Sequence, residues 1–585
     1  MTDSKVQGGD VSAGGVASAA SAVSAPLDKK SMLAVMHAHM GVAVGGPLCE
    51  YAPAFSNDNK QLFCCAGNIV KVYSTITSEQ VGIFRGHAAP VTGVLLHPGN
   101  PSLVLTCSLD GTVRCWNPAE FLCVETFKVG AAVLHMTSAK RCQNMVYLNV
   151  NPRHGEPDGD NSCLIGSLSL ESTSARKSHD AKPQPDSDGK QPQQQQRRLW
   201  KQLYGARNCT GLAVTSDGEH LASISARTLF VYSLKTRVLL KHHHVRPLHN
   251  LAFHPTDSYL ATGDAKGQIL LWYKFHAADV VTSVLHWHAH AVASLAFTED
   301  GAYLLSGGEE AVLVFWQLDT GHRQYVPRLG GTITAITVSP DGNRYALACF
   351  DNAIRLVDAV SSKVVAQIQG LQHARASAVR SSAALSSTPH VPRSLMSELV
   401  VEPRHRLLVL PGAPGAIQFY DVYRDRHVSE LEIVHRNFVS RVDDEHSIPT
   451  RIERVAFNRD GRWMATVERR AGASDETTEV LVLKIWRLDE ALQQYQLNTR
   501  INAPHKGRVT ALKFHPNRDL LVTASADNTF KVWTLTERTL EPVINDALRR
   551  ARDPNAMDVD QKEARKVSPD TLFAWRCDGV SDECC

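Results

Sequence analysis

The same pattern of residues occurs near both ends of the chain, and this recurrence limits the possible folds more than any other feature. One copy, GHAAPVTGVLLHPGNPSLVLTCSLDGTVRCW, runs from Gly86 to Trp116, and another, HKGRVTALKFHPNRDLLVTASADNTFKVW, runs from His505 to Trp533. Each copy contains a histidine, a serine, an aspartate and a closing tryptophan, namely His87, Ser108, Asp110 and Trp116, and His505, Ser525, Asp527 and Trp533. Repetition within one chain predicts a structural repeat.

The same residue types also suggest an alternative, a catalytic site. A serine, a histidine and an aspartate can supply a nucleophile, a base and an orienting carboxylate. An active site is rarely built twice in one chain, however, and weaker copies lie between the two strong ones. They begin at His249, at His290 and near Ile333, with Lys266, Glu310 and Asp351 at the acidic position and Val357 in place of the last tryptophan. We therefore expect these groups to be structural and the protein not to be an enzyme.

Each copy follows one order of local signals. An alternating apolar run is followed by a turn such as HPGN, TEDG or SPDG, a run of small residues, a tight Asp-Gly or Asp-Asn turn and a final strand. Alternation with period two, interrupted by turn residues, predicts short antiparallel strands. Four such strands in about 40–45 residues are typical of a propeller blade. The sequence thus predicts an all-β fold made of β-propellers.

The repeats resemble the WD-repeat family. This resemblance implies that histidine, serine or threonine, aspartate and tryptophan form a buried hydrogen-bond network within a blade. It therefore assigns such a network to His87, Ser108, Asp110 and Trp116, and to His505, Ser525, Asp527 and Trp533. A buried imidazole and a buried carboxylate are costly unless they satisfy one another, which agrees with a structural role.

The distribution of these signals predicts several segments. We expect a disordered tail over 1–33, a seven-bladed WD-repeat propeller over 34–370 with a disordered Gln-rich insertion over 171–198, a linker over 371–394 and a partial second WD-repeat propeller over 395–585. The last stretch, DTLFAWRCDGVSDECC, begins like a strand and ends in polar residues, which suggests a second propeller that is cut short.

Composition excludes several classes of protein. The chain has 585 residues, of which 43% are apolar and 21% charged, and it contains no apolar run long enough to cross a membrane. The N-terminal segment GGDVSAGGVASAASAVSAPLDKK lacks the apolar stretch of a signal peptide, which predicts a location inside the cell. The 13 cysteines contain no C-x-x-C pair, so we expect no metal site, and no glycine loop suggests a nucleotide cofactor.

Basic residues gather in two places. A net charge of +3 is too small to indicate a general affinity for nucleic acid, so any RNA contact should be local, at Arg197, Arg198 and Lys201. A second group resembles a bipartite nuclear import signal, although a solvated loop explains it equally well. This group consists of Arg549, Arg550, Arg552, Lys562, Arg565 and Lys566.

Several stretches outside the general repeat pattern give a more specific resemblance. FRGH, LHWH, RLGGTI and PGAPGAIQFY occur in an order similar to that of the tandem-propeller WD-repeat subunits of the small-subunit processome. The resemblance implies a non-catalytic nucleolar scaffold that supports transcription and processing of pre-ribosomal RNA and small ribosomal subunit biogenesis. Its expected partners are other WD-repeat and helical processome subunits and, directly or indirectly, pre-ribosomal RNA.

The same resemblance implies no cofactor, no membrane and no small-molecule substrate. The Gln-rich insertion and the missing remainder of the second propeller depart from the pattern of these subunits and put C-terminal partner contacts in doubt. A different class stays open as the alternative. In it the chain is a WD-repeat adaptor or substrate receptor of a signalling or ubiquitin-ligase complex, and its propeller binds a peptide.

Overall fold

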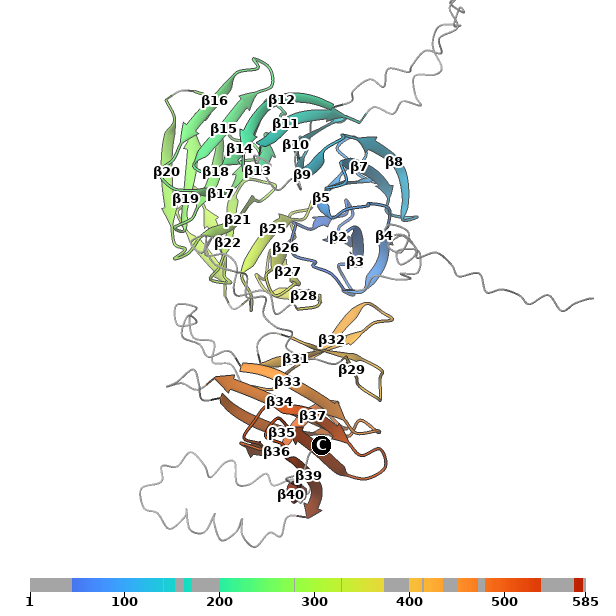
Figure 1. The fold of residues 1–585 in the computed structure, drawn as a ribbon. Helices are drawn as coiled ribbons and strands as arrows, with labels where there is room; N and C mark the ends of the chain where they lie inside the picture. Colours follow the sequence, from blue (N-terminus) through green and yellow to red (C-terminus); the bar gives the residue numbers. More distant parts are fainter. Residues whose placement is uncertain are drawn as a thin grey trace, which may run out of the picture. The chain divides into compact units, whose positions relative to one another are not determined.

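The chain folds into β-sheets in the computed structural model (Figure 1). The structure describes residues 45–139, 141–152, 162–170, 200–277, 279–327, 329–372, 399–412, 415–434, 450–471, 479–537 and 573–581. Within these ranges, forty strands form ten four-stranded antiparallel sheets, and each sheet consists of four strands that are consecutive in the sequence. The predicted all-β fold is confirmed. Three predicted segments, 1–33, 171–198 and 373–394 of the linker, lie outside the described residues.

The first four sheets cover the chain from Ala54 to His243. The first sheet consists of β1 (Ala54–Phe55), β2 (Gln61–Ala66), β3 (Ile69–Ser74) and β4 (Gln80–Phe84). The second consists of β5 (Val91–Leu96), β6 (Val104–Ser108), β7 (Thr112–Asn117) and β8 (Leu122–Lys128). The third consists of β9 (Ala132–Thr137), β10 (Met145–Asn151), β11 (Ser162–Ser169) and β12 (Trp200–Arg207). The fourth consists of β13 (Cys209–Val214), β14 (His220–Ser225), β15 (Thr228–Ser233) and β16 (Leu239–His243).

Three more sheets continue to Gln369. The fifth sheet consists of β17 (Leu248–Phe253), β18 (Tyr259–Asp264), β19 (Gln268–Tyr273) and β20 (Val281–His286). The sixth consists of β21 (Val292–Phe297), β22 (Tyr303–Gly308), β23 (Leu313–Gln317) and β24 (Arg323–Val326). The seventh consists of β25 (Ile333–Val338), β26 (Arg344–Cys349), β27 (Ala353–Asp358) and β28 (Val364–Gln369).

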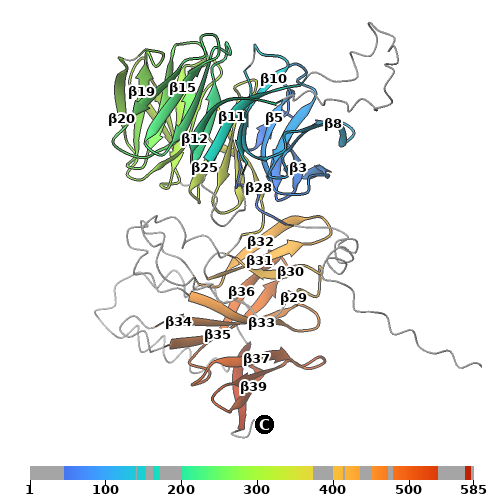
Figure 2. The same ribbon diagram turned by 45° about the horizontal axis from the view of Figure 1, so that its top comes forward.

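These seven sheets form a closed ring. The first strand of each sheet contacts the first strand of the next, in the order β1, β5, β9, β13, β17, β21, β25 and back to β1. The last strand of each sheet lies on the outside, as β8 and β20 show at opposite edges of the ring in Figures 1 and 2. Second strands such as β6 and β26 are almost completely buried because neighbouring sheets cover both of their faces.

Among the strands that the structure describes, none is exchanged between the first and last sheets of the ring. Side chains of the seventh sheet instead bind the backbone that leads into β1, and we call these contacts the closure seam. Thr334 and Thr337 donate hydrogen bonds to the carbonyl oxygens of Cys49 (3.1 Å) and Pro53 (2.8 Å). Asn352 Oδ1 accepts from the backbone N–H of Leu48 at 2.5 Å. Apolar residues of both sheets, including Leu62 and Leu356, share one buried cluster around this closure seam.

Three further sheets follow in the described residues from 399 to 581. The eighth sheet consists of β29 (Val400–Val401), β30 (Leu408–Pro411), β31 (Ala416–Asp421) and β32 (Arg426–Glu432). The ninth consists of β33 (Thr450–Phe457), β34 (Trp463–Ala471), β35 (Glu479–Asp489) and β36 (Gln494–Asn502). The tenth consists of β37 (Val509–Phe514), β38 (Leu520–Ser525), β39 (Phe530–Glu537) and β40 (Phe573–Ser581).

The strand predicted at the start of DTLFAWRCDGVS is β40, and it completes the tenth sheet instead of opening a new one. It pairs with β39 from Glu537↔Phe573 to Phe530↔Ser581. Its tryptophan, Trp575, is buried and meets Trp463 of the ninth sheet edge-on, with ring centroids 5.5 Å apart. An aromatic pair of this geometry adds to the stabilisation gained from burial, so β40 contributes to the contact between these two sheets.

The predicted Asp-Gly and Asp-Asn turns adopt the backbone conformation that those residues favour. Gly111, Asn352 and Asn528 have φ values of +75°, +60° and +62°. Glycine and asparagine reach this left-handed region at lower cost than other residues, and the preceding aspartate can accept hydrogen bonds from the turn backbone. Each of these turns joins the second and third strands of its sheet and places the aspartate beside the strand ends.

Candidate functional site

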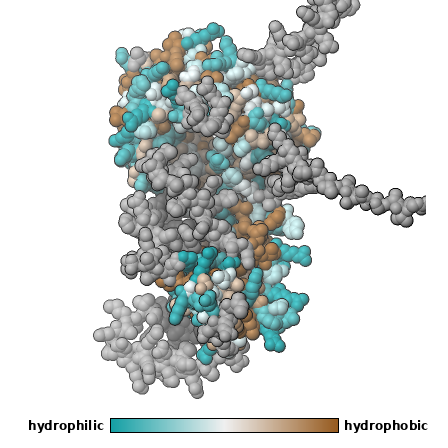
Figure 3. All heavy atoms as spheres, in the orientation of Figure 1, coloured by the Kyte–Doolittle hydropathy of each residue, from teal (hydrophilic) through white to brown (hydrophobic). Residues whose placement is uncertain are grey.

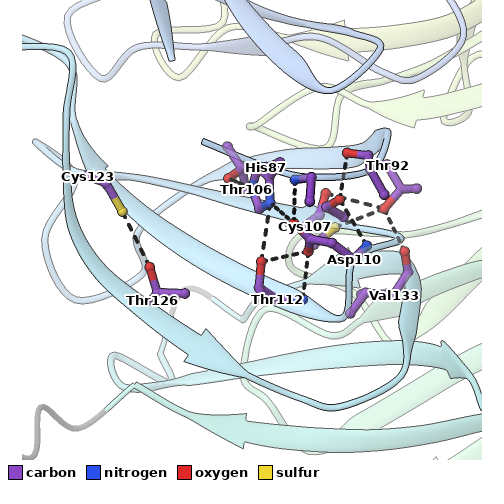
Figure 4. Close-up of polar contacts among 12 residues, drawn as sticks. His87, Thr92, Thr106, Cys107, Asp110, Thr112, Cys123, Thr126 and Val133 are labelled. Carbon is purple, nitrogen blue, oxygen red and sulfur yellow. Dashed lines mark hydrogen bonds and ion pairs between the residues drawn. The ribbon is translucent and has the colours of Figure 1, made fainter. Parts of the chain in front are cut away.

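The recurring polar residues of the second sheet form one buried chain of hydrogen bonds (Figure 4). His87 precedes β5, Thr106 lies on β6, Asp110 lies in the β6–β7 turn and Trp116 lies on β7. The indole N–H of Trp116 donates to Thr106 Oγ1 at 2.8 Å. The ring nitrogens of His87 lie 2.7 Å from Thr106 Oγ1 and 2.9 Å from Asp110 Oδ2. We call these four side chains the tetrad of the second sheet.

The acceptor at one end of the imidazole fixes the position of its proton. A carboxylate only accepts hydrogen bonds, so Nδ1 of His87 carries the hydrogen and donates to Asp110. Burial lowers the pKa of His87, although the hydrogen bond to Asp110 and its charge oppose this effect. In the resulting neutral ring, Nε2 accepts from the hydroxyl of Thr106. Hydrogen bonds therefore run in one direction, from Trp116 through Thr106 and His87 to Asp110.

The hydroxyl between the histidine and the tryptophan is not the predicted one. Ser108 donates instead to the carbonyl oxygen of Ala89 at 2.9 Å and accepts from the backbone N–H of Asp110 at 3.2 Å. It thus positions the turn that carries Asp110. Thr106 and Ser108 are two residues apart on β6 and face the same side of the strand, so the sequence alone could not distinguish their roles.

Asp110 has hydrogen-bond partners at both carboxylate oxygens. Oδ1 accepts from the backbone N–H and the hydroxyl of Thr112 at 2.9 and 2.6 Å, and Oδ2 accepts from Ala88 N–H at 3.1 Å as well as from His87. Burial alone would raise the pKa of Asp110, but the hydrogen bonds from Thr112 and His87 outweigh it and lower the pKa. This ionised carboxylate holds the turn and the histidine together.

The tenth sheet repeats the arrangement. His505 Nε2 lies 2.7 Å from Thr523 Oγ1, which also accepts from Trp533 Nε1 at 2.9 Å. His505 Nδ1 lies 3.1 Å from Thr529 Oγ1 and 3.4 Å from Asp527 Oδ2. Ser525 corresponds to Ser108, because its hydroxyl accepts from the backbone N–H of Asp527 at 3.3 Å. Thr523 and Thr106 therefore hold the same place, ten residues before the tryptophan.

The sixth sheet contains a third network, and it uses a different histidine from the one expected. His288, not His290, places its ring nitrogens 3.0 Å from Glu310 Oε2 and 2.8 Å from Ser306 Oγ. Trp316 donates to the same serine at 2.9 Å. His290 contributes only its backbone N–H, which donates to Glu310 Oε1 at 2.7 Å. The glutamate is one methylene longer than an aspartate and still reaches the imidazole.

Partial versions occur in two other sheets of the ring. In the fifth sheet, Trp272 donates to Thr262 at 2.8 Å, and the acidic position belongs to Asp264, two residues before the expected Lys266. In the seventh sheet, Asp351 receives two hydrogen bonds from Arg355, at 3.1 and 2.5 Å, in place of a histidine. The second-to-third-strand turn is thus tied down by several different side chains.

The basic residues singled out in the sequence are mostly outside the described residues. This applies to Arg197, Arg198, Arg549, Arg550, Arg552, Lys562, Arg565 and Lys566. Lys201 is described, and it lies exposed on β12, the outer strand of the third sheet. The described residues contain no group of three His, Cys, Asp or Glu side chains arranged to hold a metal ion, and no helix long and apolar enough to cross a membrane.

Comparison with known proteins identifies the family. A family model described as the first beta-propeller of WD repeat-containing protein 75 matches residues 54–352, and the model of its second beta-propeller matches residues 399–543. The chain belongs to the WD repeat-containing protein 75 family. The two matched segments of this family contain all three complete histidine networks, at His87, His288 and His505. The resemblance noted in the sequence is thereby confirmed.

Individual relatives give the extent of the similarity. Human WD repeat-containing protein 75 is 33% identical over 512 residues, which cover 85% of this chain and 56% of the human protein. U3 small nucleolar RNA-associated protein 17 of Schizosaccharomyces pombe is 29% identical over 48% of this chain and 36% of its own length. NET1-associated nuclear protein 1 of Saccharomyces cerevisiae is 27% identical over 55% and 41%. The chain spans about half the length of the vertebrate members of the WD repeat-containing protein 75 family that it matches.

Proposed function

We propose that the chain is a non-catalytic scaffold of the small-subunit processome, located in the nucleus and nucleolus, that supports pre-ribosomal RNA transcription and processing and small ribosomal subunit biogenesis. The observation that carries this proposal is the match of both parts of the chain to the two propellers of one family. Two relatives add support, because one is named for association with U3 small nucleolar RNA and the other is named a nuclear protein.

The non-catalytic part of the proposal is supported by the hydrogen bonds of the tetrads. A catalytic serine needs a base within hydrogen-bond reach, yet the hydroxyl of Ser108 donates to the Ala89 carbonyl. The ring nitrogens of His87 are both engaged by Thr106 and Asp110. The same chemistry recurs in the tenth sheet, where Thr523 stands in for Thr106. A repeated and internally satisfied network stabilises a scaffold and leaves no group for a substrate.

Its partners are proposed to be other WD-repeat and helical subunits of the small-subunit processome, together with pre-ribosomal RNA. A ring of sheets presents many turns on a rigid frame, which suits the binding of several partners at once. Purification of the tagged full-length chain from nuclear extract tests this proposal. We expect U3 small nucleolar RNA and early pre-ribosomal RNA to co-purify, and depletion to lower small-subunit precursors while large-subunit maturation continues.

Other outcomes of the purification would contradict the proposal. Recovery of a ubiquitin-ligase core or a signalling complex, without pre-ribosomal RNA, would favour the adaptor function instead. Retention of normal small-subunit precursor levels after depletion would remove the role in processing. A tagged unrelated propeller protein, expressed at the same level, provides the control for non-specific RNA.

Direct RNA contact is proposed at Lys201, beside Arg197 and Arg198 in the sequence. An exposed lysine that binds a phosphate contributes about one unit to the slope of binding against salt concentration. We expect Lys201→Glu to reduce RNA cross-linking and this slope. Lys128→Glu is the matched control, because Lys128 is also exposed on the outer strand of its sheet. Equal RNA binding by the two variants would contradict the contact.

Nuclear import is proposed to use the basic residues from Arg549 to Lys566. A reporter fused to residues 547–568 tests this assignment directly. We expect nuclear accumulation of the fusion, and its loss when Lys562, Arg565 and Lys566 are replaced by alanine. A fusion that stays in the cytoplasm would show that the segment is an ordinary solvated loop.

A further inference from the structure

The outer edge of strand β20 lacks the side chains that usually protect an edge strand from pairing with another chain. Its sequence, VTSVLH, contains no charged residue and no proline. It pairs with β19 without interruption from Gln268↔His286 to Tyr273↔Val281 and is the last strand of its sheet. In an antiparallel strand every second residue directs its N–H and C=O away from the paired neighbour, so the outer side of β20 offers a row of free main-chain groups. No strand in the described part of the chain pairs with that side.

The other outer strands of the ring carry features that discourage pairing with a further strand. Charges, bulges and short length all have this effect. β8, β12, β16 and β24 contain charged side chains, and the last of these is only four residues long. β4 and β28 lack charges, but their pairing is interrupted by register shifts at Val72/Tyr73 and Leu356/Val357. Only β20 combines six regular pairs with the absence of charge among the described outer strands of the ring.

A groove adjoins this edge. It has a volume of about 250 Å³ and lies between the outer strands of the fifth and sixth sheets. Its walls combine apolar and aromatic residues, including Leu271, Leu285 and Trp316, with polar ones, including Ser283, His286 and Gln317. On the face seen in Figure 3, polar and apolar residues of the ring are interspersed.

The pairing register of β19 and β20 shows which side chains of β20 face the groove. Residues directly opposite in an antiparallel pair share one face, so Val281, Ser283 and Leu285 of β20 lie on the same face as Tyr273 and Leu271 of β19. That face borders the groove. A strand added outside β20 would continue the row and direct every second side chain toward the groove. Val281 is 56% exposed, so apolar surface is available at this position.

Arg323 gives the site a charge preference. It lines the groove from the start of β24 and is exposed to solvent. Its guanidinium carbon lies 5.3 Å from the centroid of the Trp316 ring, which holds the positive charge close to the apolar wall. A carboxylate of a partner segment can bind the Arg323 guanidinium, since a guanidinium forms two parallel hydrogen bonds with a carboxylate.

We infer that β20 and the adjoining groove form a docking site for an extended segment of a partner protein. The segment adds to the fifth sheet as a fifth strand, places alternate apolar or aromatic side chains toward the groove and presents an acidic residue to Arg323. Main-chain hydrogen bonds supply affinity in this mode of recognition, and the alternating side chains supply specificity. The inference depends on the edge and the groove alone and holds whichever assembly contains the chain.

Site-specific photo-cross-linking in cells tests the inference with the full-length chain. A benzophenone amino acid is placed at Thr282 on β20 and, as a matched control, at Thr126 on β8, because both threonines are exposed on outer strands. Mass spectrometry then maps the cross-linked segment. We expect position 282, but not position 126, to capture one segment of another protein with alternating apolar residues and at least one acidic residue.

A synthetic peptide with the mapped sequence is then titrated against the purified full-length chain. We expect Val281→Lys and Arg323→Glu each to weaken binding at least about tenfold, and exchange of the acidic peptide residue for lysine to restore binding to Arg323→Glu. Val124→Lys is the control, because Val124 is 60% exposed on β8. Thermal unfolding establishes that each variant is folded, and Arg323→Glu carries the test if Val281→Lys is unstable.

Three results would overturn the inference. The first is cross-linking at position 282 that does not exceed that at position 126. The second is capture of β20 from another copy of the chain, which would identify the edge as a self-association site. The third is binding of the mapped peptide that is unchanged by Arg323→Glu in a folded protein.

Discussion

A single threonine hydroxyl links the His87 imidazole to the Trp116 indole in the interior of the second sheet. Thr106 accepts from the Trp116 indole and donates to the His87 ring, and all three residues are buried. Burying such groups is tolerable only because each has a partner, and removal of one partner leaves the others unsatisfied. The stability of the sheet should therefore respond more to this hydroxyl than its size suggests.

The first prediction replaces that hydroxyl by a methyl group. Thr106→Val keeps the shape of the side chain but leaves Trp116 Nε1 without an acceptor and His87 Nε2 without a donor. We expect a loss of about 1–3 kcal/mol in the free energy of unfolding, measured by urea denaturation. Thr126→Val, at an exposed position of β8, is the control and should change stability by less than about 0.5 kcal/mol. Equal effects would contradict a structural tetrad.

The second prediction concerns the acceptor at the end of the chain of hydrogen bonds. Asp110→Ala removes the partner of His87 and of the Thr112 backbone, so we expect it to destabilise the fold by about 1–3 kcal/mol. Asp58→Ala is the control, because the Asp58 side chain is 57% exposed in a turn. Thermal unfolding measures both. A hydrolase activity lost in Ser108→Ala without a change in stability would instead indicate catalysis.

The third prediction follows from the histidine pKa values. Burial lowers the pKa of His87 and of His505 below the usual 6.5, so protonation favours the unfolded chain. Their contribution to stability is complete above the unfolded value of about 6.5 and declines as the pH falls from there toward the folded pKa. The urea concentration at the midpoint of unfolding should decrease as the pH is lowered from 8 to 5.

Variants assign this pH dependence to the tetrads. His87→Gln should make the profile flatter between about pH 6.5 and pH 5, because one titrating group is removed. His322→Gln, at an exposed position, is the control variant. The carboxylate acts at lower pH, since the lowered pKa of Asp110 preserves its contribution until the pH falls below about 3.8. A pH-independent midpoint between 8 and 5 would contradict neutral buried histidines.

At the scale of single residues, the sequence predicted residue types better than it predicted individual partners. Repetition marked His87, Asp110 and Trp116, and the six-residue spacing from aspartate to tryptophan is the same in the tenth sheet. It could not separate Thr106 from Ser108, because both are small hydroxyl residues on the same face of one strand. It also selected His290 over His288, since the difference depends on how far the loop before β21 turns inward, a property of the packed sheets.

Turns between the second and third strands determine how closely neighbouring sheets can pack. Gly267, between β18 and β19, has a φ of +79°, and a methyl group there would overlap the carbonyl oxygen of His288, which precedes the next sheet. Gly342, in the turn before β26, has a similar φ of +73° but open space around it. An alanine at Gly342 therefore meets only the cost of the left-handed backbone conformation, whereas an alanine at Gly267 also clashes with the neighbouring backbone.

The fourth prediction compares these glycines. Gly342→Ala should cost about 1–2 kcal/mol, which is the cost of the left-handed conformation for a residue with a side chain. Gly267→Ala should cost about 1–3 kcal/mol more, because backbone of the adjoining sixth-sheet region must also move. Urea denaturation of both variants at one pH gives the comparison. Equal destabilisation would contradict the close approach between these sheets.

Whole elements were more predictable than single contacts. Period-two alternation and the Asp-Gly or Asp-Asn turns located strands such as β6, β7, β38 and β39 because these signals are local. The regular edge of β20 and its groove were not anticipated. Both depend on which strand ends a sheet and on how two sheets diverge, and neither property is encoded in the periodicity of one strand.

Closure of the ring depends on side chains that bridge residues about 300 positions apart in the sequence. Asn352 accepts from Leu48 N–H at 2.5 Å and donates to the carbonyl oxygens of Gly46 at 3.1 Å and of Leu371 at 2.7 Å. One amide group thus holds the backbone at both ends of the seven-sheet ring. Such a contact could not be predicted from the sequence, because an Asp-Asn pair also occurs as an ordinary turn at Asp527 and Asn528.

The fifth prediction tests this closure seam. Asn352→Ala removes three hydrogen bonds to the backbone, and we expect it to lower the free energy of unfolding by about 1–3 kcal/mol. Hydrogen exchange should accelerate in residues 45–55. Asn352→Gly separates the loss of the side chain from the cost of the positive φ, and Asn343→Ala in an exposed turn is the control. Unchanged exchange in residues 45–55 would contradict the closure seam.

The described strands of the ring are not exchanged between sheets, and this has a consequence for the synthesis of the ring on the ribosome. In all but the third sheet, whose last strand follows a longer segment, the four strands lie within about 40–45 residues of one another. Each of these sheets can pair its backbone as soon as its own stretch has emerged, and none waits for a strand from the other end of the chain. Once the seventh sheet has been synthesised, closure of the ring requires only contacts made by its side chains. The nascent chain therefore carries no described sheet that must stay incomplete until translation of the ring has finished.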